Sequence, residues 1–215
     1  VAISGFGNVS WGTASKLEEL GAIPITISGP DGYILDEEGV LGEKIDYLLE
    51  LRASGKNICK PYADKFKSAK FIEGKKPREV KADMYIPCAT QNEILIDDAK
   101  AIVASGAKYV CEGSNMSSSN EAIEYMLNNG IILGPSKAAN AGGVACSCIE
   151  MGQNSGKTVF KPEQVHAQLK DIMVNIHDAA KNAAEEYGYG YNLVAGANIA
   201  GFLKVADSMI AQGCV

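Results

Sequence analysis

The chain has 215 residues, of which 47% are hydrophobic, so it can bury a substantial core and disorder is not expected. Its formal net charge of −6, with acidic and basic residues mixed along the chain, argues against a protein that binds nucleic acid through a basic face. No uninterrupted apolar run reaches the roughly 18 residues that a membrane-spanning helix needs, and no secretion signal is recognisable, so no membrane association is expected.

Short apolar runs alternate with longer helical stretches, which is typical of an α/β fold of the doubly wound, Rossmann type. The runs are apolar throughout, as expected for a mostly parallel sheet with helices on both faces. In chain order, the predicted strands are Val1–Ser4, Ile23–Ile27, Ala82–Ile86, Tyr109–Cys111 and Ile131–Leu133. The predicted helices are at about 8–20, 43–53, 96–105, 119–129, 138–155, 163–187 and 197–212, with loops at 29–42, 55–61 and 73–78.

A glycine-rich string joins the first predicted strand to the first helix, and it reads Gly5-Phe6-Gly7-Asn8-Val9-Ser10. Gly5 permits the tight turn, and Gly7 lets the main chain approach a pyrophosphate. The free N–H groups around Asn8 and Val9 then face the phosphates. Ser10 stands where Gly or Ala is usual and is small enough for close packing. The string therefore predicts a dinucleotide site, with a turn of another α/β protein, such as a methyltransferase, as the alternative.

Selection between NAD and NADP is expected at the end of the second strand. Pro30 and Asp31 lie there; the Asp31 carboxylate accepts from a ribose hydroxyl in this interpretation and repels a 2′-phosphate. Arg52 and Lys56 are the nearby cations that would instead neutralise such a phosphate. Plain turn chemistry is the other interpretation of Asp31, because P-D-G is a common turn string. The sequence favours NAD over NADP.

The six cysteines include no C-x-x-C pair, and two histidines accompany them, so no metal site is expected. Most of the cysteines lie in apolar surroundings, as reduced buried thiols do. A reducing, cytoplasmic location is the simplest interpretation.

Four further segments are hard to explain as scaffold alone: Pro87–Glu93, Glu112–Met116, Pro135–Val144 and Gly196–Phe202. With the opening G-F-G-N-V string, they resemble the coenzyme domain of the hexameric glutamate dehydrogenases, clostridial members in particular. The resemblance covers essentially the whole chain, in order and without large gaps. It implies a cofactor-binding set of Gly5, Phe6, Gly7, Asn8, Val9, Pro30, Asp31, Ala89, Thr90, Asn92 and Asn115.

Within that set, Asn115 is expected to bond the nicotinamide-side ribose or carboxamide. The alternative is that Asn115 caps the helix that begins near Ser119. The sequence departs from the family at Ser117, where proline is usual, and this puts the rigidity of the turn in doubt.

The resemblance also implies a substrate face made of Asn140, Val144 and Ser147, which a helix presents together because of their spacing. Asn140 is expected near the α-amino end of the substrate, Val144 against its aliphatic chain and Ser147 on its γ-carboxylate. Gly142 and Gly143 let a ligand approach this helix. Close packing of a small-residue helix on the sheet is the structural alternative, although two glycines inside a helix cost roughly 1 kcal/mol each relative to alanine.

Together, these features predict the coenzyme-binding half of an NAD(P)-dependent glutamate dehydrogenase, which is hexameric and deaminates L-glutamate to 2-oxoglutarate and ammonia. Residues 1–195 are expected to form the Rossmann domain, and residues 196–215 a helix that packs back toward an N-terminal substrate domain outside this chain. The resemblance places the catalytic residues in that domain, so the chain alone is expected to be inactive. A leucine or phenylalanine dehydrogenase and a non-catalytic nucleotide-sensing module are the alternatives.

Overall fold

The computed structural model describes residues 1–213, so Cys214 lies outside the described residues. The chain divides into two compact units, Val1–Ile132 and Leu133–Val215, called here the N-terminal and C-terminal units. The sequence-based boundary at residue 195 is not where this division falls. The reason is that the last two helices, α8 (Pro162–Glu186) and α9 (Leu193–Gln212), pack on each other and belong to one unit.

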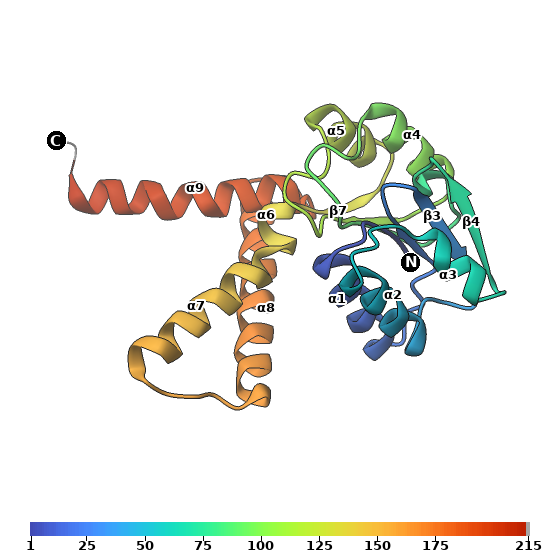
Figure 1. Ribbon diagram of the computed structural model, residues 1–215. Helices are drawn as coiled ribbons and strands as arrows, with labels where there is room; N and C mark the ends of the chain where they lie inside the picture. Colours follow the sequence, from blue (N-terminus) through green and yellow to red (C-terminus); the bar gives the residue numbers. More distant parts are fainter. Residues whose placement is uncertain (214–215) are drawn as a thin grey trace. The chain divides into compact units, whose positions relative to one another are not determined.

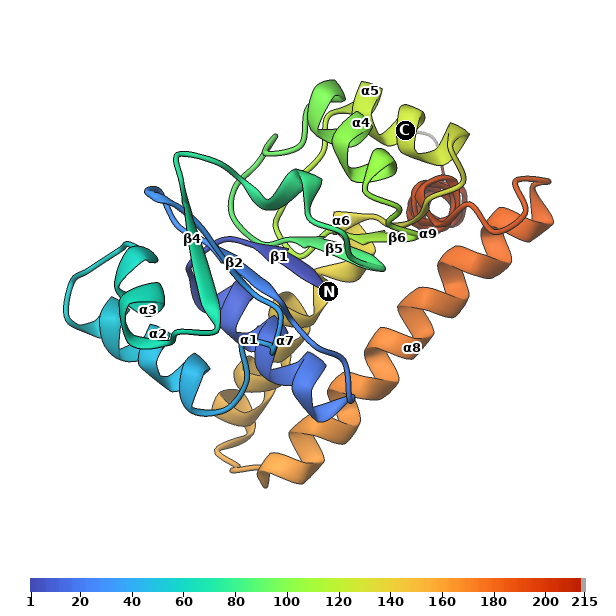
Figure 2. The same ribbon diagram turned by 90° about the vertical axis from the view of Figure 1, so that its right-hand side faces the viewer.

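The N-terminal unit is built on a parallel sheet, which confirms the predicted fold class. Parallel pairing joins β1 to β5 and β5 to β6, with Ile3 beside Ile86 and Tyr85 beside Val110. The order in this sheet is β1-β5-β6-β7, and Figure 2 shows β1, β5 and β6 in that order. Its strands are β1 (Ala2–Ser4), β5 (Met84–Pro87), β6 (Tyr109–Cys111) and β7 (Ile132–Gly134), the last of which contains the boundary between the units.

A second strand, β2 (Thr26–Ser28), lies on the other side of β1. The Ile25 N–H donates to the Val1 carbonyl (2.9 Å), and the Ser28 N–H donates to the Gly5 carbonyl (3.2 Å). Between these bonds the Thr26 hydroxyl accepts from the Ile3 N–H (2.8 Å) and donates to the Ile3 carbonyl (2.9 Å). β1 therefore has a neighbour on each side. In open α/β folds, ligands bind outside the carboxyl end of a strand at which the strand order reverses in this way.

The prediction of a loop over 29–42 was wrong, because β3 (Gly32–Asp36) lies inside it and pairs with β2 as an antiparallel hairpin. Its turn closes through the Gly29 N–H on the Gly32 carbonyl (2.8 Å). β4 (Ala69–Glu73), which was not predicted, pairs antiparallel with β3. A P-D-G turn between two β-rich runs is a hairpin signal, and the sequence interpretation treated it only as a turn.

Helices cover both faces of the parallel sheet (Figure 1). α1 (Asn8–Glu19) and α2 (Glu43–Ala53) lie on one face, and α4 (Ile96–Ala104) and α5 (Asn120–Asn128) on the other. These four were predicted to within one residue at each end. Two short elements were not predicted: α3 (Lys60–Lys65) and the 3₁₀ helix η1 (Pro77–Glu79).

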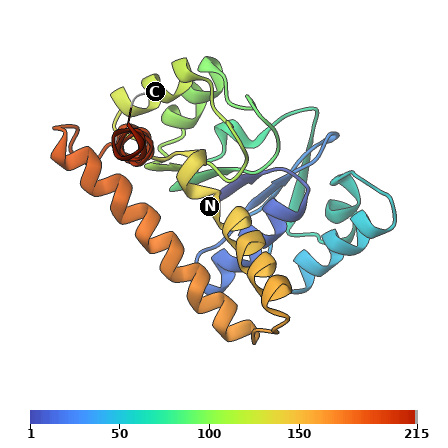
Figure 3. The same ribbon diagram turned by 90° about the vertical axis from the view of Figure 1, so that its left-hand side faces the viewer.

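The C-terminal unit is helical. The predicted helix 138–155 is two helices, α6 (Ser136–Ala139) and α7 (Ala141–Gly156), because the chain leaves helical geometry at Asn140. α7 lies along α8 (Pro162–Glu186), and α9 (Leu193–Gln212) leaves the end of α8 steeply, so that α9 is seen end-on where α8 is seen along its length (Figure 3).

Most of the apolar surface of α9 is exposed. The helix has 20 residues, and an 18-residue stretch of it has a mean hydropathy of 1.4, with 11% of that stretch buried. By length and composition, α9 can therefore cross a membrane. Lys204 and Asp207 interrupt its apolar run, so no uninterrupted apolar run long enough to span a membrane was predicted there. The core helix of a soluble protein passes the same test, so length and composition alone do not distinguish the two.

Candidate functional site

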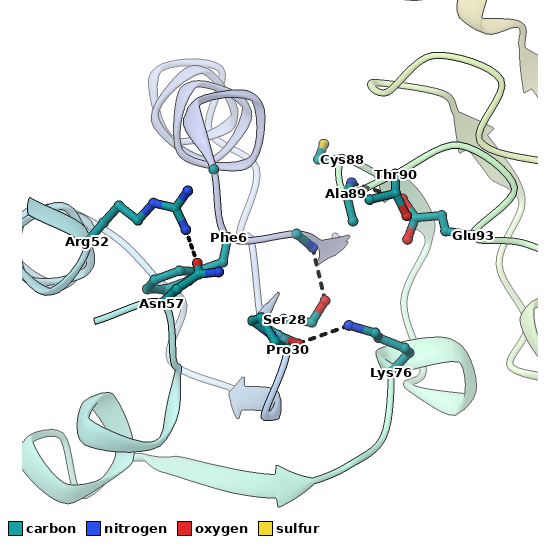
Figure 4. Close-up of a pocket in the computed structure, with 13 residues that line it drawn as sticks. Phe6, Ser28, Pro30, Arg52, Asn57, Lys76, Cys88, Ala89, Thr90 and Glu93 are labelled. Carbon is teal, nitrogen blue, oxygen red and sulfur yellow. Dashed lines mark hydrogen bonds between the residues drawn. The ribbon is translucent and has the colours of Figure 1, made fainter. Parts of the chain in front are cut away.

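A pocket of about 340 Å³ opens in the N-terminal unit where three strands end. Its walls come from the turn after β1, the segment after β2 and the loop after β5, which are the carboxyl ends of neighbouring strands. This is where ligands bind in open α/β folds. The pocket is lined by Gly5, Phe6, Gly7, Ser28, Gly29, Pro30, Arg52, Asn57, Lys76, Cys88, Ala89, Thr90 and Glu93 (Figure 4).

The glycine-rich turn forms the first wall. Gly5 has a φ of +102°, and its N–H donates to the Ser28 hydroxyl (2.9 Å). The buried Ser10 hydroxyl accepts from the Gly7 N–H (2.9 Å) and donates to the Gly7 carbonyl (2.8 Å). Serine at the third position of the fingerprint thus fixes the turn as well as packing closely.

α1 begins directly after this turn, at Asn8. Asn8 and Val9 are both exposed, and amides in the first turn of a helix have no carbonyl before them within the helix to bond. Such amides, with the positive end of the helix dipole, attract phosphate. The turn therefore presents anion-binding groups beside the pocket.

The second wall follows β2 and contains Pro30 but not Asp31. The Asp31 carboxylate accepts from the Cys59 N–H (2.9 Å) and the Lys60 N–H (3.0 Å). It thus binds the amides at the start of α3, a distant contact rather than the local turn chemistry of the P-D-G string. Its charge nevertheless stays next to Pro30 in the chain.

Cations stand near this wall. Lys76 donates to the Gly29 carbonyl (2.9 Å), and Arg52 donates to the Asn57 side chain. Arg52 was one of the two cations predicted to be available to neutralise a 2′-phosphate. Lys76 and Asn57 were missed, because only the folded chain brings them beside residues 28–30.

The third wall is the loop after β5, which supplies Cys88, Ala89 and Thr90. Burial raises the pKa of the Cys88 thiol to about 12, so this thiol stays protonated and is not a nucleophile. The Ala89 N–H donates to the Glu93 carboxylate (2.9 Å). Figure 4 shows Ala89, Thr90 and Glu93 at one end of the pocket and Arg52 and Asn57 at the other.

Asn92 and Asn115 lie outside the pocket lining, on exposed loops that bond to each other. The Asn92 N–H donates to the Met116 carbonyl (2.8 Å). Ser119, not Asn115, caps α5 and accepts from the Ala122 N–H (3.3 Å), so the capping alternative for Asn115 does not hold.

The departure from the family at Ser117 does not leave that turn loose. Ser117 is fully buried, and its hydroxyl lies 2.7 Å from the Ser114 hydroxyl and 3.0 Å from the Ser114 carbonyl, to which it donates. Hydroxyl bonds thus do here what a proline ring does by restricting φ.

Six of the eleven predicted cofactor residues line one pocket: Gly5, Phe6, Gly7, Pro30, Ala89 and Thr90. Asn8 and Val9 adjoin it at the start of α1. The pocket does not include Asp31, Asn92 or Asn115. Glu93 was also missed, although its carboxylate bonds to both Ser4 and Ala89; its place in the Pro87–Glu93 segment was the one signal for it.

The predicted substrate residues belong to the C-terminal unit, at and after the start of α7. Val144 is 69% exposed, and Ser147 is exposed with its hydroxyl donating to the Gly143 carbonyl (3.3 Å). A Cβ at Gly143 meets nothing within 4 Å, and one at Gly142 makes only ordinary contacts. Packing within the described residues therefore requires neither glycine.

The family of the chain follows from its sequence as a whole. A model of the family described as glutamate/leucine/phenylalanine/valine dehydrogenase matches residues 1–213. The chain belongs to this family. Both the pocket of the N-terminal unit and the start of α7 lie inside the matched residues.

Relatives within the family are similar over the whole chain. The NAD-specific glutamate dehydrogenase of Clostridium symbiosum is 53% identical over 99% of this chain, and the NADP-specific enzyme of Giardia intestinalis is 45% identical over 100% of it. A solved glutamate dehydrogenase covers 100% of the chain with 52% identity and a TM-score of 0.96, and that of Plasmodium falciparum does so with 42% identity and 0.94. The chain spans about half the length of these relatives.

Proposed function

We propose that this chain is the coenzyme-binding half of a glutamate dehydrogenase. The observation that carries the proposal is the pocket beside the glycine-rich turn, lined by six residues that the family resemblance assigns to the cofactor. The names of the relatives support it, since NAD- and NADP-specific glutamate dehydrogenases match along the whole chain. In the intact protein, the proposed reaction is the reversible oxidative deamination of L-glutamate to 2-oxoglutarate and ammonia.

A nicotinamide dinucleotide would accept the hydride in this reaction. The residues of this chain bind and orient it. The amides of Asn8 and Val9 receive the pyrophosphate, and the wall after β2 receives the adenosine half. The loop with Ala89 and Thr90 then receives the other half. Isothermal titration of NAD into the purified chain is expected to show one site, and absence of binding at millimolar NAD contradicts the proposal.

We expect NAD to bind at least about tenfold more tightly than NADP, a difference of about 1.4 kcal/mol. The Asp31 carboxylate lies next to Pro30 on the adenosine side and repels a 2′-phosphate, whereas Arg52 and Lys76 on the pocket lining act in the opposite direction. Parallel titrations of the two cofactors measure the balance. Tighter binding of NADP shows that the two cations outweigh the carboxylate.

The purified chain is expected to bind dinucleotide without oxidising glutamate. The proposed catalytic residues belong to the half of the protein that this chain does not contain, and the Cys88 thiol in the pocket is held protonated. Absorbance at the nicotinamide band, recorded with NAD and glutamate, checks this. Glutamate-dependent reduction of NAD by the chain alone means that catalytic residues lie within it.

For the substrate, we propose that Asn140, Val144 and Ser147 bind glutamate in the intact protein, with Ser147 on the γ-carboxylate. The polar side chain of Ser147 favours glutamate over the leucine and phenylalanine alternatives. The exposed apolar face of α9 fits a surface of the missing half, and the intact protein is proposed to be a cytoplasmic hexamer. Five cysteines of the described residues are free thiols, which suits a reducing compartment.

A further inference from the structure

The carboxylate of Glu93 touches two walls of the pocket at once. One oxygen, Oε1, accepts from the Ala89 N–H (2.9 Å) on the loop after β5. The other, Oε2, accepts from the Ser4 hydroxyl (2.7 Å) at the end of β1, one residue before the glycine-rich turn. Because the Glu93 side chain is only 5% exposed, water does not compete well for these bonds.

Arg78 forms a buried ion pair with this carboxylate. The Arg78 side chain is 8% exposed, and its guanidinium lies 3.4 Å from Glu93 Oε2 and also donates to the Glu93 carbonyl. Its remaining partners are Asp98 (3.1 Å) and the Tyr85 hydroxyl. A planar guanidinium with several fixed acceptors defines the position of its partner much better than a lone ion pair does.

The pair is hard to explain by stability alone. A buried ion pair contributes little net stability compared with apolar residues of the same size, because both charges must be desolvated. An unpaired Glu93 carboxylate on the pocket lining would also repel a pyrophosphate. Arg78 removes that repulsion while the carboxylate keeps its two bonds to the walls.

We propose that Glu93 is a positioning residue which, held by Arg78, sets the spacing between the glycine-rich turn and the Ala89–Thr90 wall, and so the fit of the non-adenosine half of the ligand. This inference rests on the proposed dinucleotide function. It predicts an asymmetric effect. Dinucleotides lie across the point where strand order reverses, with one half on each side. ADP uses the turn and the wall after β2, whereas NAD also needs the wall that Glu93 positions.

The test compares NAD and ADP binding to the parent chain and to Glu93→Gln by isothermal titration. The amide loses the charge and has a single acceptor oxygen, so it cannot accept from both walls as the carboxylate does, and NAD affinity is expected to fall about fivefold or more. ADP affinity is expected to stay within about twofold. A general loss of structure lowers both affinities together, so equal losses, or no loss, overturn the inference.

Two further variants keep the test decisive. Asp98→Asn changes a partner of Arg78 that touches neither wall. Its amide oxygen still accepts from the Arg78 Nε–H, but the oxygen that accepts from the Leu95 N–H is lost, so the variant is expected to lower stability without changing the ratio of NAD to ADP affinity. A change in that ratio as large as for Glu93→Gln overturns the inference.

If Glu93→Gln does not fold, Ser4→Ala serves in its place. It removes one of the two wall contacts of Glu93 and leaves the ion pair with Arg78, and an unchanged ratio of NAD to ADP affinity in this variant overturns the inference. A parent chain that binds neither ligand contradicts the proposed function instead.

Discussion

Gly196→Ala is expected to destabilise the C-terminal unit by at least about 3 kcal/mol, because it forces two helices apart. A Cβ at Gly196, near the start of α9, lies 1.8 Å from the Ala180 carbonyl oxygen and 2.7 Å from its carbon on α8. Both contacts are with backbone, which cannot rotate away as a side chain does. Urea unfolding followed by far-UV circular dichroism measures the loss, since α8 and α9 are the two longest helices described.

Gly201→Ala is the matched control in the same helix. A Cβ at Gly201 meets nothing within 4 Å, so the substitution only replaces a flexible helical residue with the best helix former. It is expected to stabilise the unit by about 0.5–1 kcal/mol. Equal effects of the two substitutions would mean that the close approach of α9 to Ala180 is not as described.

Gly5→Ala is expected to destabilise the N-terminal unit by about 4 kcal/mol, the sum of backbone strain and overpacking. Gly5 has a φ of +102°, which an alanine rarely adopts, and a Cβ there lies 2.5 Å from the Cys88 carbonyl oxygen and 2.7 Å from its carbon. The same clash pushes the glycine-rich turn away from the loop after β5. Dinucleotide binding is therefore expected to be lost as well.

Fluorescence of Trp11 reports this unfolding directly. It is the one tryptophan of the chain, it lies on α1, and its ring packs edge-on against Phe6 at a centroid distance of 5.9 Å. A urea midpoint within error of the parent protein would show that the turn and the loop after β5 are further apart than the structure has them.

The sequence predicted elements with a strong local period and missed those that depend on distant partners. α2 is found over the predicted residues 43–53, because its apolar residues recur at helical spacing. β4 was missed because its partner, β3, lies more than 30 residues earlier and its own five residues carry no turn signal. The segment around Asn140 was predicted as one helix from its residue types, whereas the structure divides it at Asn140 into α6 and α7.

The same distinction holds for the pocket. Gly5 and Gly7 were predicted because their spacing is a property of one turn. Lys76 reaches the Gly29 carbonyl across 47 residues, and Asp31 binds amides 28 and 29 residues away, so neither contact is visible in the local sequence. Local chemistry thus located the glycine-rich turn that lines the pocket, but tertiary structure decides which side chains complete the pocket around it.

The central claim is that the backbone of the glycine-rich turn receives a pyrophosphate, and Gly7→Ala tests it most directly. Gly7 has an extended backbone (φ −131°), and a Cβ there meets no protein atom within 4 Å, so the unfolding free energy is expected to stay within about 0.5 kcal/mol of the parent. That Cβ instead occupies space the ligand needs. Titration of NAD into Gly7→Ala is expected to give a Kd at least about tenfold weaker than for the parent chain. An unchanged Kd in the folded variant contradicts the account.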